Sequence, residues 1–249
     1  MSKNEYGWFG RYQSWEEAQK QCSGYDSQII VERVKDALLK VKHGEAAFER
    51  DSVTFDKPEY VWPVLAALLW NAAQGGGKMN VLDFGGSLGS SYFQYERFLK
   101  NLAVNWSVVE QKIFVEYGKK YFEDERLTFY FDLQEYTTER KADVILLSSV
   151  LPYLPDPYSV LETLLQLAAP LVIFDKMPFL LEGDSDVITI QKVPPSIYEA
   201  SYPAWFFNEK KFHEFIGRKY EVVAEFTDED SANIPSVFKG IIATLKPAI

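Results

Sequence analysis

The stretch Val81-Leu82-Asp83-Phe84-Gly85-Gly86-Ser87-Leu88-Gly89-Ser90 decides the fold of this chain. The apolar run that ends at Phe84 predicts a short buried strand, and the glycines after it predict an abrupt turn. Apolar residues at helical spacing from Ser90 to Leu102 then predict a helix. Glycines at this point let the backbone approach a ligand without a Cβ in the way, and the helix start offers unpaired N–H groups. The sequence therefore predicts a ligand-binding strand, loop and helix.

Two classes of cofactor use this architecture, and the glycine spacing separates them. A nicotinamide fingerprint, G-x-G-x-x-G, would need glycine where reading from Gly85 gives Ser87 and Ser90. The pattern D-x-G-x-x-x-G formed by Asp83, Gly85 and Gly89 instead resembles motif I of class I S-adenosylmethionine-dependent methyltransferases, usually D-x-G-x-G-x-G. Ser87 stands at its middle glycine. The alternative is a tight turn that binds no ligand.

This resemblance implies S-adenosylmethionine as cofactor, bound where predicted strands end in polar residues. Asp83 and the glycine loop would hold the methionine end, and Glu110, about twenty residues beyond the loop, would take the ribose hydroxyls. Asp132 with Leu133 would face the adenine edge, although a helix N-cap is an equal alternative for Asp132. Ser148 would lie beside the sulfonium, but capping the turn after its strand is the stronger alternative. The predicted cofactor residues are Asp83, Gly85, Gly86, Ser87, Gly89, Glu110, Asp132, Leu133 and Ser148.

Composition and charge narrow the class of protein. The 249 residues suit one doubly wound domain with extra segments at both ends, and 47% hydrophobic residues suffice for a core. A net charge of −10 argues against a nucleic-acid partner. The single cysteine, Cys22, excludes an intrachain disulfide and favours a reducing compartment. With no signal segment and no apolar run long enough to span a bilayer, we expect a cytoplasmic protein.

Strand and helix signals alternate along most of the chain. We expect an N-terminal helical cap over residues 1–75 and a class I methyltransferase domain over residues 76–249. Its fold would be α/β: a three-layer, doubly wound Rossmann-like sheet, mostly parallel with an antiparallel last strand. Within it, residues 176–205 are expected to form a long irregular segment on the substrate side, because long loops in compact domains are usually functional.

Asp175 ends the fifth predicted strand and is the first candidate for a general base or a metal ligand. A structural ion pair with Lys176 or Arg50 is an equal alternative. His213 shares its predicted helix with apolar neighbours, so an ordinary half-buried histidine is the favoured interpretation. No spacing such as H-x-x-x-H or C-x-x-C predicts a metal site, and we expect none.

The segment of residues 188–207 combines prolines with several aromatic side chains. Tyr198, Tyr202 and Trp205 offer flat apolar faces with polar edges, and Gln191 offers an amide; such surfaces suit a sugar ring. The alternative is a rigid aromatic plug that only packs against the cap. Tyr198 or Tyr202 could also accept a proton or a hydrogen bond during the reaction.

Six stretches carry a closer resemblance: Trp8-Phe9-Gly10, Ser14-Trp15-Glu16-Glu17-Ala18, Gly24-Tyr25-Asp26, Glu49-Arg50-Asp51-Ser52, residues 81–89 and residues 193–203. They resemble a family of bacterial methyltransferases commonly encoded among surface-polysaccharide biosynthesis genes. That resemblance implies methyl transfer to an oxygen, or less readily a nitrogen, of a saccharide or sugar-nucleotide precursor. One run differs: Asp175-Lys176-Met177-Pro178 stands where an Asp-Arg-Thr-Pro-like run is expected, and lysine offers a point charge rather than a planar fork.

Three clusters outside the predicted sheet, residues 6–12, 49–52 and 194–205, would close over the cofactor as one aromatic pocket. Arg50 would then supply a cation for an anionic group of the substrate, unless it pairs structurally with Glu49 or Asp51. A non-catalytic cofactor-binding or scaffold protein remains the alternative, because no Asn-Pro-Pro-Tyr-like motif follows the fourth strand. A dehydrogenase is disfavoured by the glycine spacing. The sequence leaves a homodimer open.

Overall fold

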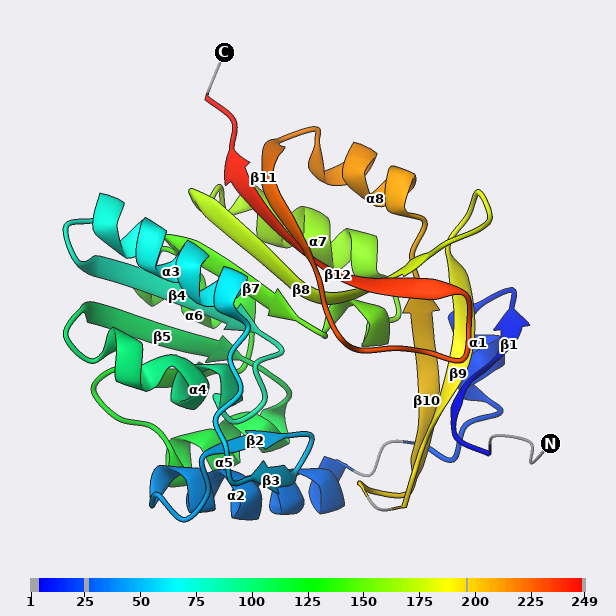
Figure 1. Cartoon of the computed structure of the whole chain (residues 1–249), viewed down its shortest axis with the longest axis horizontal. Coiled ribbons are helices and arrows are strands. Elements are labelled where there is room, and N and C mark those ends of the chain that lie inside the picture. The colour runs from blue at the N-terminus through cyan, green and yellow to red at the C-terminus, as the bar shows by residue number, and fades with distance from the viewer. Residues whose placement is uncertain (1–4, 25–26, 196, 248–249) are drawn as a thin grey trace. The chain divides into compact units, whose positions relative to one another are not determined.

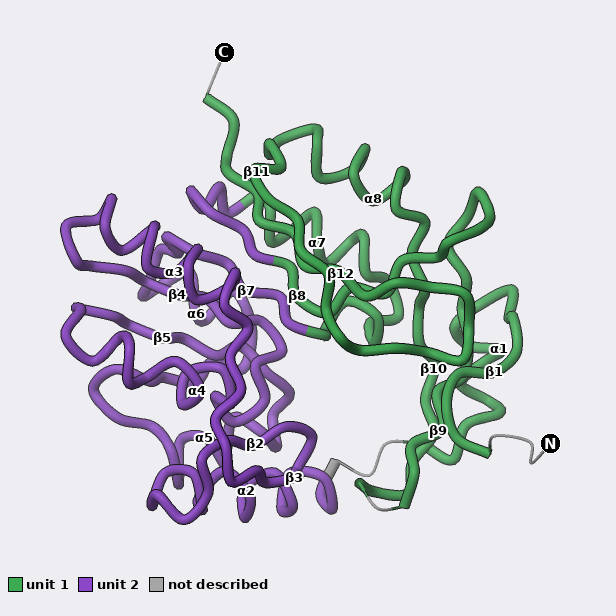
Figure 2. Tube along the Cα trace, viewed as in Figure 1, with its two compact units in different colours: residues 1–26, 149–166, 174–249 green, residues 27–148, 167–173 purple. Residues whose placement is uncertain are grey.

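The computed structural model describes residues 5–24, 27–195 and 197–247. The chain forms two compact units, coloured separately in Figure 2. Tyr25 and Asp26, part of one stretch that carries the family resemblance, lie outside the described residues. None of the helices found in the described ranges has the length and apolar composition of a membrane span. Unit 1 takes in residues 1–26, 149–166 and 174–249, and unit 2 takes in residues 27–148 and 167–173.

Unit 2 is built on parallel strands whose order reverses once. Strand β4 pairs in parallel with β5 on one side and with β7 on the other, and β5 pairs in parallel with β6. The chain therefore moves outward from β4 to β6 and then returns to the opposite side of β4. Such a reversal is the point at which open α/β sheets bind ligands. These strands are β4 (Lys78–Phe84), β5 (Ala103–Val109), β6 (Leu127–Tyr130) and β7 (Val144–Ser148).

Helices cover both faces of the unit 2 strands: in Figure 1, α3 and α4 lie in front of them and α6 behind. Strands covered on both faces need continuous apolar residues, and Val81, Leu82, Ile145 and Leu147 are all fully buried. The hairpin of β2 and β3 packs against α2 and α4. The remaining elements are α2 (Ser27–Lys42), β2 (Phe48–Arg50), β3 (Val53–Phe55), α3 (Trp62–Gln74), α4 (Ser90–Leu99), α5 (Lys112–Tyr121) and α6 (Leu133–Glu139).

Unit 1 contains the longer antiparallel strand pairs. Strands β11 and β12 pair antiparallel, and β9 pairs antiparallel with both β1 and β10 in a separate three-stranded sheet. The side chain of Asn233 holds β1: it accepts from the N–H of Trp8 at 2.7 Å and donates to its carbonyl at 2.8 Å. The elements are β1 (Gly7–Tyr12), α1 (Trp15–Gln19), a 3-10 turn η1 (Leu151–Tyr153), α7 (Pro157–Gln166), β9 (Val187–Val193), β10 (Ala200–Phe206), α8 (Glu209–Ile216), β11 (Tyr220–Thr227) and β12 (Ser236–Leu245).

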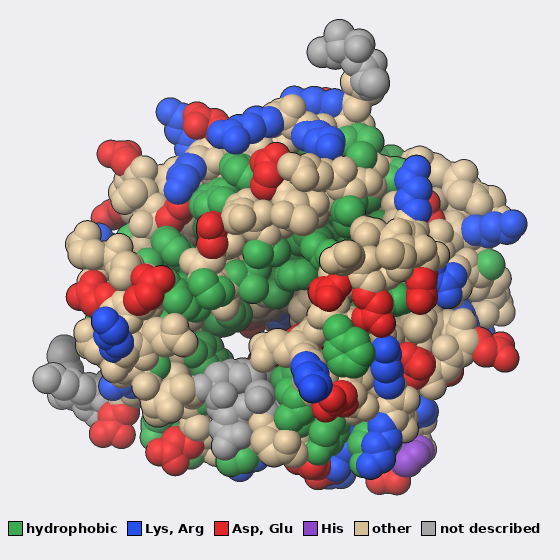
Figure 3. Space-filling view, turned by 180° about the vertical axis from the view of Figure 1, so that it is seen from behind, with side chains coloured by type: hydrophobic (Ala, Val, Ile, Leu, Met, Phe, Trp, Pro, Cys, Tyr) green, Lys and Arg blue, Asp and Glu red, His purple; other side chains and the backbone are tan. Residues whose placement is uncertain are grey.

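Strand β8 (Leu171–Leu180) runs from unit 2 into unit 1, and the main sheet has the order β11-β12-β8-β7-β4-β5-β6. The predicted Rossmann-like α/β sheet, mostly parallel with an antiparallel edge, is confirmed. Acidic and basic side chains lie interspersed on the face drawn in Figure 3, as expected of a mixed surface on an acidic protein.

The structure differs from the sequence expectations in two segments. Residues 176–205 are not irregular, because β8 continues to Leu180 and strands β9 and β10 follow. Within residues 1–75 the three helices are accompanied by strands β1, β2 and β3. Strand β1 pairs with β9, about 180 residues later, and a partner so distant leaves no signal in local periodicity. The domain boundary near residue 75 stays a prediction.

Candidate functional site

The glycine loop between β4 and α4 alternates its backbone handedness. Gly85, Ser87 and Gly89 have φ values of 74°, 54° and 89°, all in the left-handed region. These are the three glycine positions of the D-x-G-x-G-x-G pattern, so the motif marks backbone conformations that favour glycine. Ser87 adopts the same conformation as its glycine neighbours and bears the strain of a side chain there.

Gly86 is required for a different reason, the close approach of Asp83. A Cβ added to Gly86 would lie 2.4 Å from the Asp83 Cγ, closer than real atoms pack. The Asp83 carboxylate is only 1% exposed and accepts a hydrogen bond from Trp106 Nε1 at 3.0 Å. Burial raises the pKa of Asp83 to about 7, and the indole hydrogen bond acts in the opposite direction. The loop is thus folded tightly over a buried carboxylate.

Glu110 follows β5 at the same edge of the sheet. The Gly85 N–H donates to the Val109 carbonyl at 2.9 Å, which holds the loop beside the end of β5. The Glu110 carboxylate accepts from the backbone N–H groups of Gln111 and Ser87. Burial, followed by the charge of Asp83, raises the pKa of Glu110 to about 7. The structure therefore brings Asp83, the loop and Glu110 together; their role toward a ligand stays a prediction.

Glu49 is a third acidic side chain near this loop, and it is buried. The sequence analysis placed its stretch, residues 49–52, over the cofactor but gave its carboxylate no role except pairing with Arg50. It is 3% exposed, and its oxygens accept from the Ser90 hydroxyl at 2.7 Å and from the Ser52 N–H at 2.8 Å. Ser90 is the first residue of α4, directly after the glycine loop. Burial raises the pKa of Glu49 to about 7. The hairpin turn beside it places Asp51 and Ser52 in the left-handed region, which is strained for both residues.

The remaining predicted cofactor residues lie beyond β6 and at the end of β7. Asp132 caps α6: its Oδ1 accepts the Glu135 N–H at 2.8 Å, and Glu135 accepts the Phe131 N–H in return. The capping alternative for Asp132 is therefore realised, and its adenine role, with that of the half-buried Leu133, stays a prediction. Ser148 is half-buried as the last residue of β7.

These carboxylates can hold a ligand that donates hydrogen bonds or carries positive charge. None of the ion pairs within the described part of the chain involves Asp83 or Glu110. A buried carboxylate without a counter-charge is costly, and a bound cation would lower its pKa and stabilise its charged form. An ammonium group beside Asp83 and a diol beside Glu110 would satisfy both.

In unit 1 the structure gathers the predicted tyrosines around an amide. The hydroxyls of Tyr198 and Tyr202 lie 3.3 Å apart. Tyr202 pairs with Gln191 across β9 and β10, and its ring meets Tyr153 edge to face at 5.4 Å. The Tyr153 hydroxyl donates to Gln191 Oε1 at 2.8 Å. We call Tyr153, Gln191, Tyr198 and Tyr202 the tyrosine cluster. The sequence analysis did not predict Tyr153 as a member, because it lies in a turn about 40 residues before Gln191.

Trp205, grouped with these tyrosines from the sequence, belongs to the other face of the same small sheet. It lies three residues after Tyr202 on β10, and alternation along a strand then places it opposite. Its ring stacks on Trp15 of α1 at 6.3 Å and packs against Ile188. For Trp205 the alternative interpretation is therefore realised, because its ring forms part of the packing that holds α1 on the sheet.

Asp175 does not end its strand, as the sequence suggested, because β8 continues through it to Leu180. Its side chain is buried, and its carbonyl accepts the Ser149 N–H at 3.0 Å. Ser149 and Lys176 both have left-handed φ values, 54° and 56°, so backbone strain gathers around Asp175. Lys176 pairs with Asp230 at 3.1 Å.

Arg50 has a structural partner in Glu59, which the sequence analysis did not name. Its guanidinium lies 3.6 Å from Glu59 Oε1 and 5.9 Å from the centre of the Phe55 ring. Arg50 belongs to unit 2, whereas Asp175 and the tyrosine cluster belong to unit 1. A common aromatic pocket closed by both units stays a prediction.

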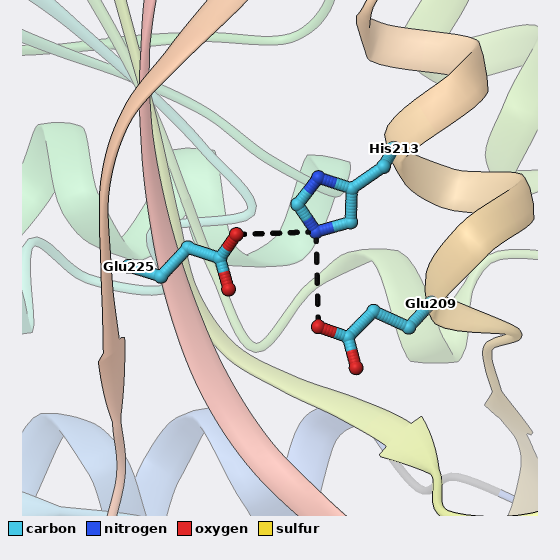
Figure 4. Close-up of side chains that lie close together, drawn as sticks. All are labelled: Glu209, His213 and Glu225. Atoms are coloured by element: carbon cyan, nitrogen blue, oxygen red, sulfur yellow. Dashed lines mark ion pairs between the residues drawn. The ribbon is translucent and has the colours of Figure 1, made fainter.

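His213 takes part in a charged network within unit 1 (Figure 4). Its Nε2 lies 3.8 Å from Glu209 Oε1 and 3.5 Å from Glu225 Oε1. These three side chains could offer ligand atoms to a metal ion, yet the Lys239 ammonium already pairs with both glutamates. The Glu209 hydrogen bond raises the pKa of Lys239, which keeps it charged. The arrangement is an ion-pair network around a half-buried histidine.

Solved structures share this fold. The N-terminal domain of EvdMO1, solved in the presence of SAH and D-fucose, matches with a TM-score of 0.53 at 13% identity, over 89% of this chain and 98% of that one. The glycopeptide N-methyltransferase MtfA, complexed with (S)-adenosyl-L-methionine, matches with a TM-score of 0.51 at 10% identity, over 73% and 93%. The chain has the class I methyltransferase fold.

A third structure of the same fold has a different kind of activity. A pericyclic reaction enzyme matches with a TM-score of 0.52 at 12% identity, over 76% of this chain and 49% of its own. One fold can host several reactions, so the reaction has to be argued from the site. No protein-family model matches the sequence, and neither does any curated protein sequence.

Proposed function

We propose that the protein is an enzyme that transfers the sulfonium methyl group of S-adenosylmethionine to a small-molecule acceptor. The observation that supports this most is the tight loop of residues 85–89 folded against Asp83, beside Glu110, at the switch point of the sheet. Two structures of the same fold were solved with SAH or S-adenosylmethionine.

The residues of this edge suit the parts of that cofactor. Asp83 and the loop amides would hold the methionine end, with the ammonium group compensating the buried carboxylate. Glu110 would accept hydrogen bonds from the ribose hydroxyls, and Asp132 with Leu133 would face the adenine. Ser148 would lie beside the sulfonium.

The reaction would be an in-line displacement at the methyl carbon. The carbon–sulfur bond breaks and leaves a neutral thioether, while the acceptor oxygen forms the new bond and loses its proton to a base. Much of the rate would come from holding acceptor and methyl group in line. Asp175, Tyr198 and Tyr202 are the candidates for accepting that proton or a hydrogen bond, and Arg50 is the candidate for an anionic group of the acceptor.

The acceptor we propose is a saccharide or sugar-nucleotide precursor of a bacterial surface polysaccharide, modified in the cytoplasm. The tyrosine cluster supports this, because it combines ring faces with hydroxyl groups and an amide, the two kinds of surface that a sugar presents. The EvdMO1 domain of similar fold was solved in the presence of D-fucose.

Titration calorimetry with S-adenosylhomocysteine tests the cofactor. Wild-type protein should bind, and Asp83→Ala and Glu110→Ala should each weaken binding by roughly a hundredfold, about 2.7 kcal/mol. Asp143→Ala is the matched control, because Asp143 also accepts a hydrogen bond within the sheet, from the Asn80 N–H at 2.8 Å, at the opposite end of the strands. Its affinity should stay near wild type.

Two results would contradict the proposal. If wild-type protein fails to bind S-adenosylhomocysteine, S-adenosylmethionine is not its cofactor. If Asp143→Ala loses as much affinity as Asp83→Ala and Glu110→Ala, these variants weaken binding only by destabilising the protein. Formation of S-adenosylhomocysteine with a panel of sugar nucleotides then tests catalysis. Binding without turnover across that panel would favour the non-catalytic alternative.

A further inference from the structure

Helix α3 has an apolar face that the fold of the protein does not use. Its sequence, Trp-Pro-Val-Leu-Ala-Ala-Leu-Leu-Trp-Asn-Ala-Ala-Gln, contains no charged residue. Val64, Leu65 and Leu68 are buried and attach the helix to unit 2. Trp62, however, is 60% exposed, and Trp70 is 44% exposed. Two large exposed tryptophans on one uncharged helix call for a partner.

The exposed residues form one stripe along the helix. They are spaced by four, three, one and three residues, the pattern of a single helical face. We call this stripe the outer face of α3. Its two alanines leave room for another helix to approach closely between the large side chains. The outer face consists of Trp62, Ala66, Leu69, Trp70 and Ala73.

Neighbouring aromatic rings hold Trp62 in place. The Tyr60 ring lies 5.2 Å from the Trp62 ring and the Phe98 ring 5.8 Å from it, each tilted or edge-on. Arg97 stacks on Phe98 at 5.3 Å, at the margin of this group. A large aromatic side chain that is already ordered loses little entropy on association, and such residues anchor interfaces.

We propose that the outer face of α3 is a homodimer interface, in which α3 packs against α3 of a second copy across a two-fold axis near Ala66. A protein with a net charge of −10 repels its own copies, and an uncharged face is where two copies can meet with the least repulsion. A strongly charged partner would find no complementary charge on this helix. A two-fold interface uses the same face on both copies, as an apolar, self-complementary stripe allows.

The exposed area fits the core of such an interface. A tryptophan presents up to about 250 Å², so Trp62 and Trp70 together leave about 260 Å² uncovered. A standard interface covers about 800 Å² on each partner, of which the centre is apolar and the rim polar. The tryptophans would supply the centre, and Leu69, the alanines and the polar neighbours of the helix would complete it.

A charge-swap experiment on residue 66 tests the two-fold arrangement. Ala66→Glu should shift the wild-type dimer to monomer in light scattering coupled to gel filtration, because two carboxylates would meet at the axis. Ala66→Lys should do the same. Both residues are good helix formers at an exposed position, so the fold should persist. An equimolar mixture of the two variants should recover the dimer, since residue 66 then faces its opposite charge.

Leu181→Glu is the matched control, because Leu181 is 64% exposed in unit 1, outside the outer face. It should leave the dimer intact. Wild-type protein that is monomeric at high micromolar concentration, or Ala66→Glu that stays dimeric, would overturn the proposal. So would a mixture that fails to recover the dimer. Monomeric protein that co-sediments with lipid vesicles through this face would assign it to a membrane instead. The proposed methyl transfer does not depend on any of these outcomes.

Discussion

Replacing Gly86 by alanine should damage the protein out of proportion to the single added carbon. The new Cβ would lie 2.4 Å from Asp83 Cγ, and the carboxylate cannot retreat without leaving Trp106 Nε1, its partner at 3.0 Å. Overpacking of a tight site costs about 1–3 kcal/mol. Loss of a hydrogen bond to a buried charged group adds about 1.5–3 kcal/mol. We therefore expect the free energy of unfolding to fall by about 3 kcal/mol.

Urea unfolding of wild type and Gly86→Ala measures this difference through the transition midpoint. The control is Gly76→Ala: Gly76 lies in the turn after α3 with φ of 63°, and its added Cβ would meet nothing within 4 Å. The free energy of unfolding of that variant should fall by only about 1–2 kcal/mol, the cost of placing a side chain on left-handed backbone. A second comparison adds Gly86→Ala to the Asp83→Ala variant. Without the Asp83 carboxylate to clash with, Gly86→Ala should hardly lower the free energy of unfolding further. A Gly86→Ala variant within 0.5 kcal/mol of wild type, about the scatter of a harmless surface change, would refute the clash.

Two further predictions concern the buried carboxylates. Burial raises the pKa values of Asp83, Glu110 and Glu49 to about 7 in the folded protein, above their unfolded values, so the folded state binds more protons between about pH 4.5 and pH 7. These groups should therefore make stability fall as pH rises through that window, and Asp83→Asn should remove part of the fall in urea midpoint; an unchanged slope would contradict this. Glu49→Gln and Ser90→Ala should each weaken S-adenosylhomocysteine binding about tenfold in calorimetry, and the double variant little more, because both break one contact at the start of α4. Additive losses would show that the two residues act separately.

The strand, the glycine loop and the acidic residue of the candidate site could be predicted to lie together because their signals are local. Asp83, the loop of residues 85–89 and Glu110 lie within 30 residues, and each ends or begins an element whose periodicity is visible in the sequence. The glycine spacing also predicts which positions adopt a left-handed backbone, because the local backbone conformation, and not a distant partner, determines where glycine is needed. Ser87 shows that this rule tolerates one exception.

The features that were missed depend on pairings between distant segments. Glu49 contacts the start of α4 because a hairpin about 40 residues upstream packs there. No pattern in the sequence of that hairpin predicts that the Glu49 carboxylate is buried. Tyr153 joins Gln191 across a similar gap. Asp175 was predicted to end its strand, yet the strand continues past it to Leu180. Local patterns carry no information on such contacts.

The pairing of β1 with β9 has a consequence for the order in which the chain folds during synthesis. Trp8 is made early, but its strand partner Gln191 and the side chain of Asn233 are made about 180 and 225 residues later. At about 5–20 residues per second, the first strand waits roughly 10–45 s for its neighbours, while the parallel strands of unit 2 are completed. Until then its aromatic residues are available to a chaperone. Unit 1 can close only after Asn233 has been made.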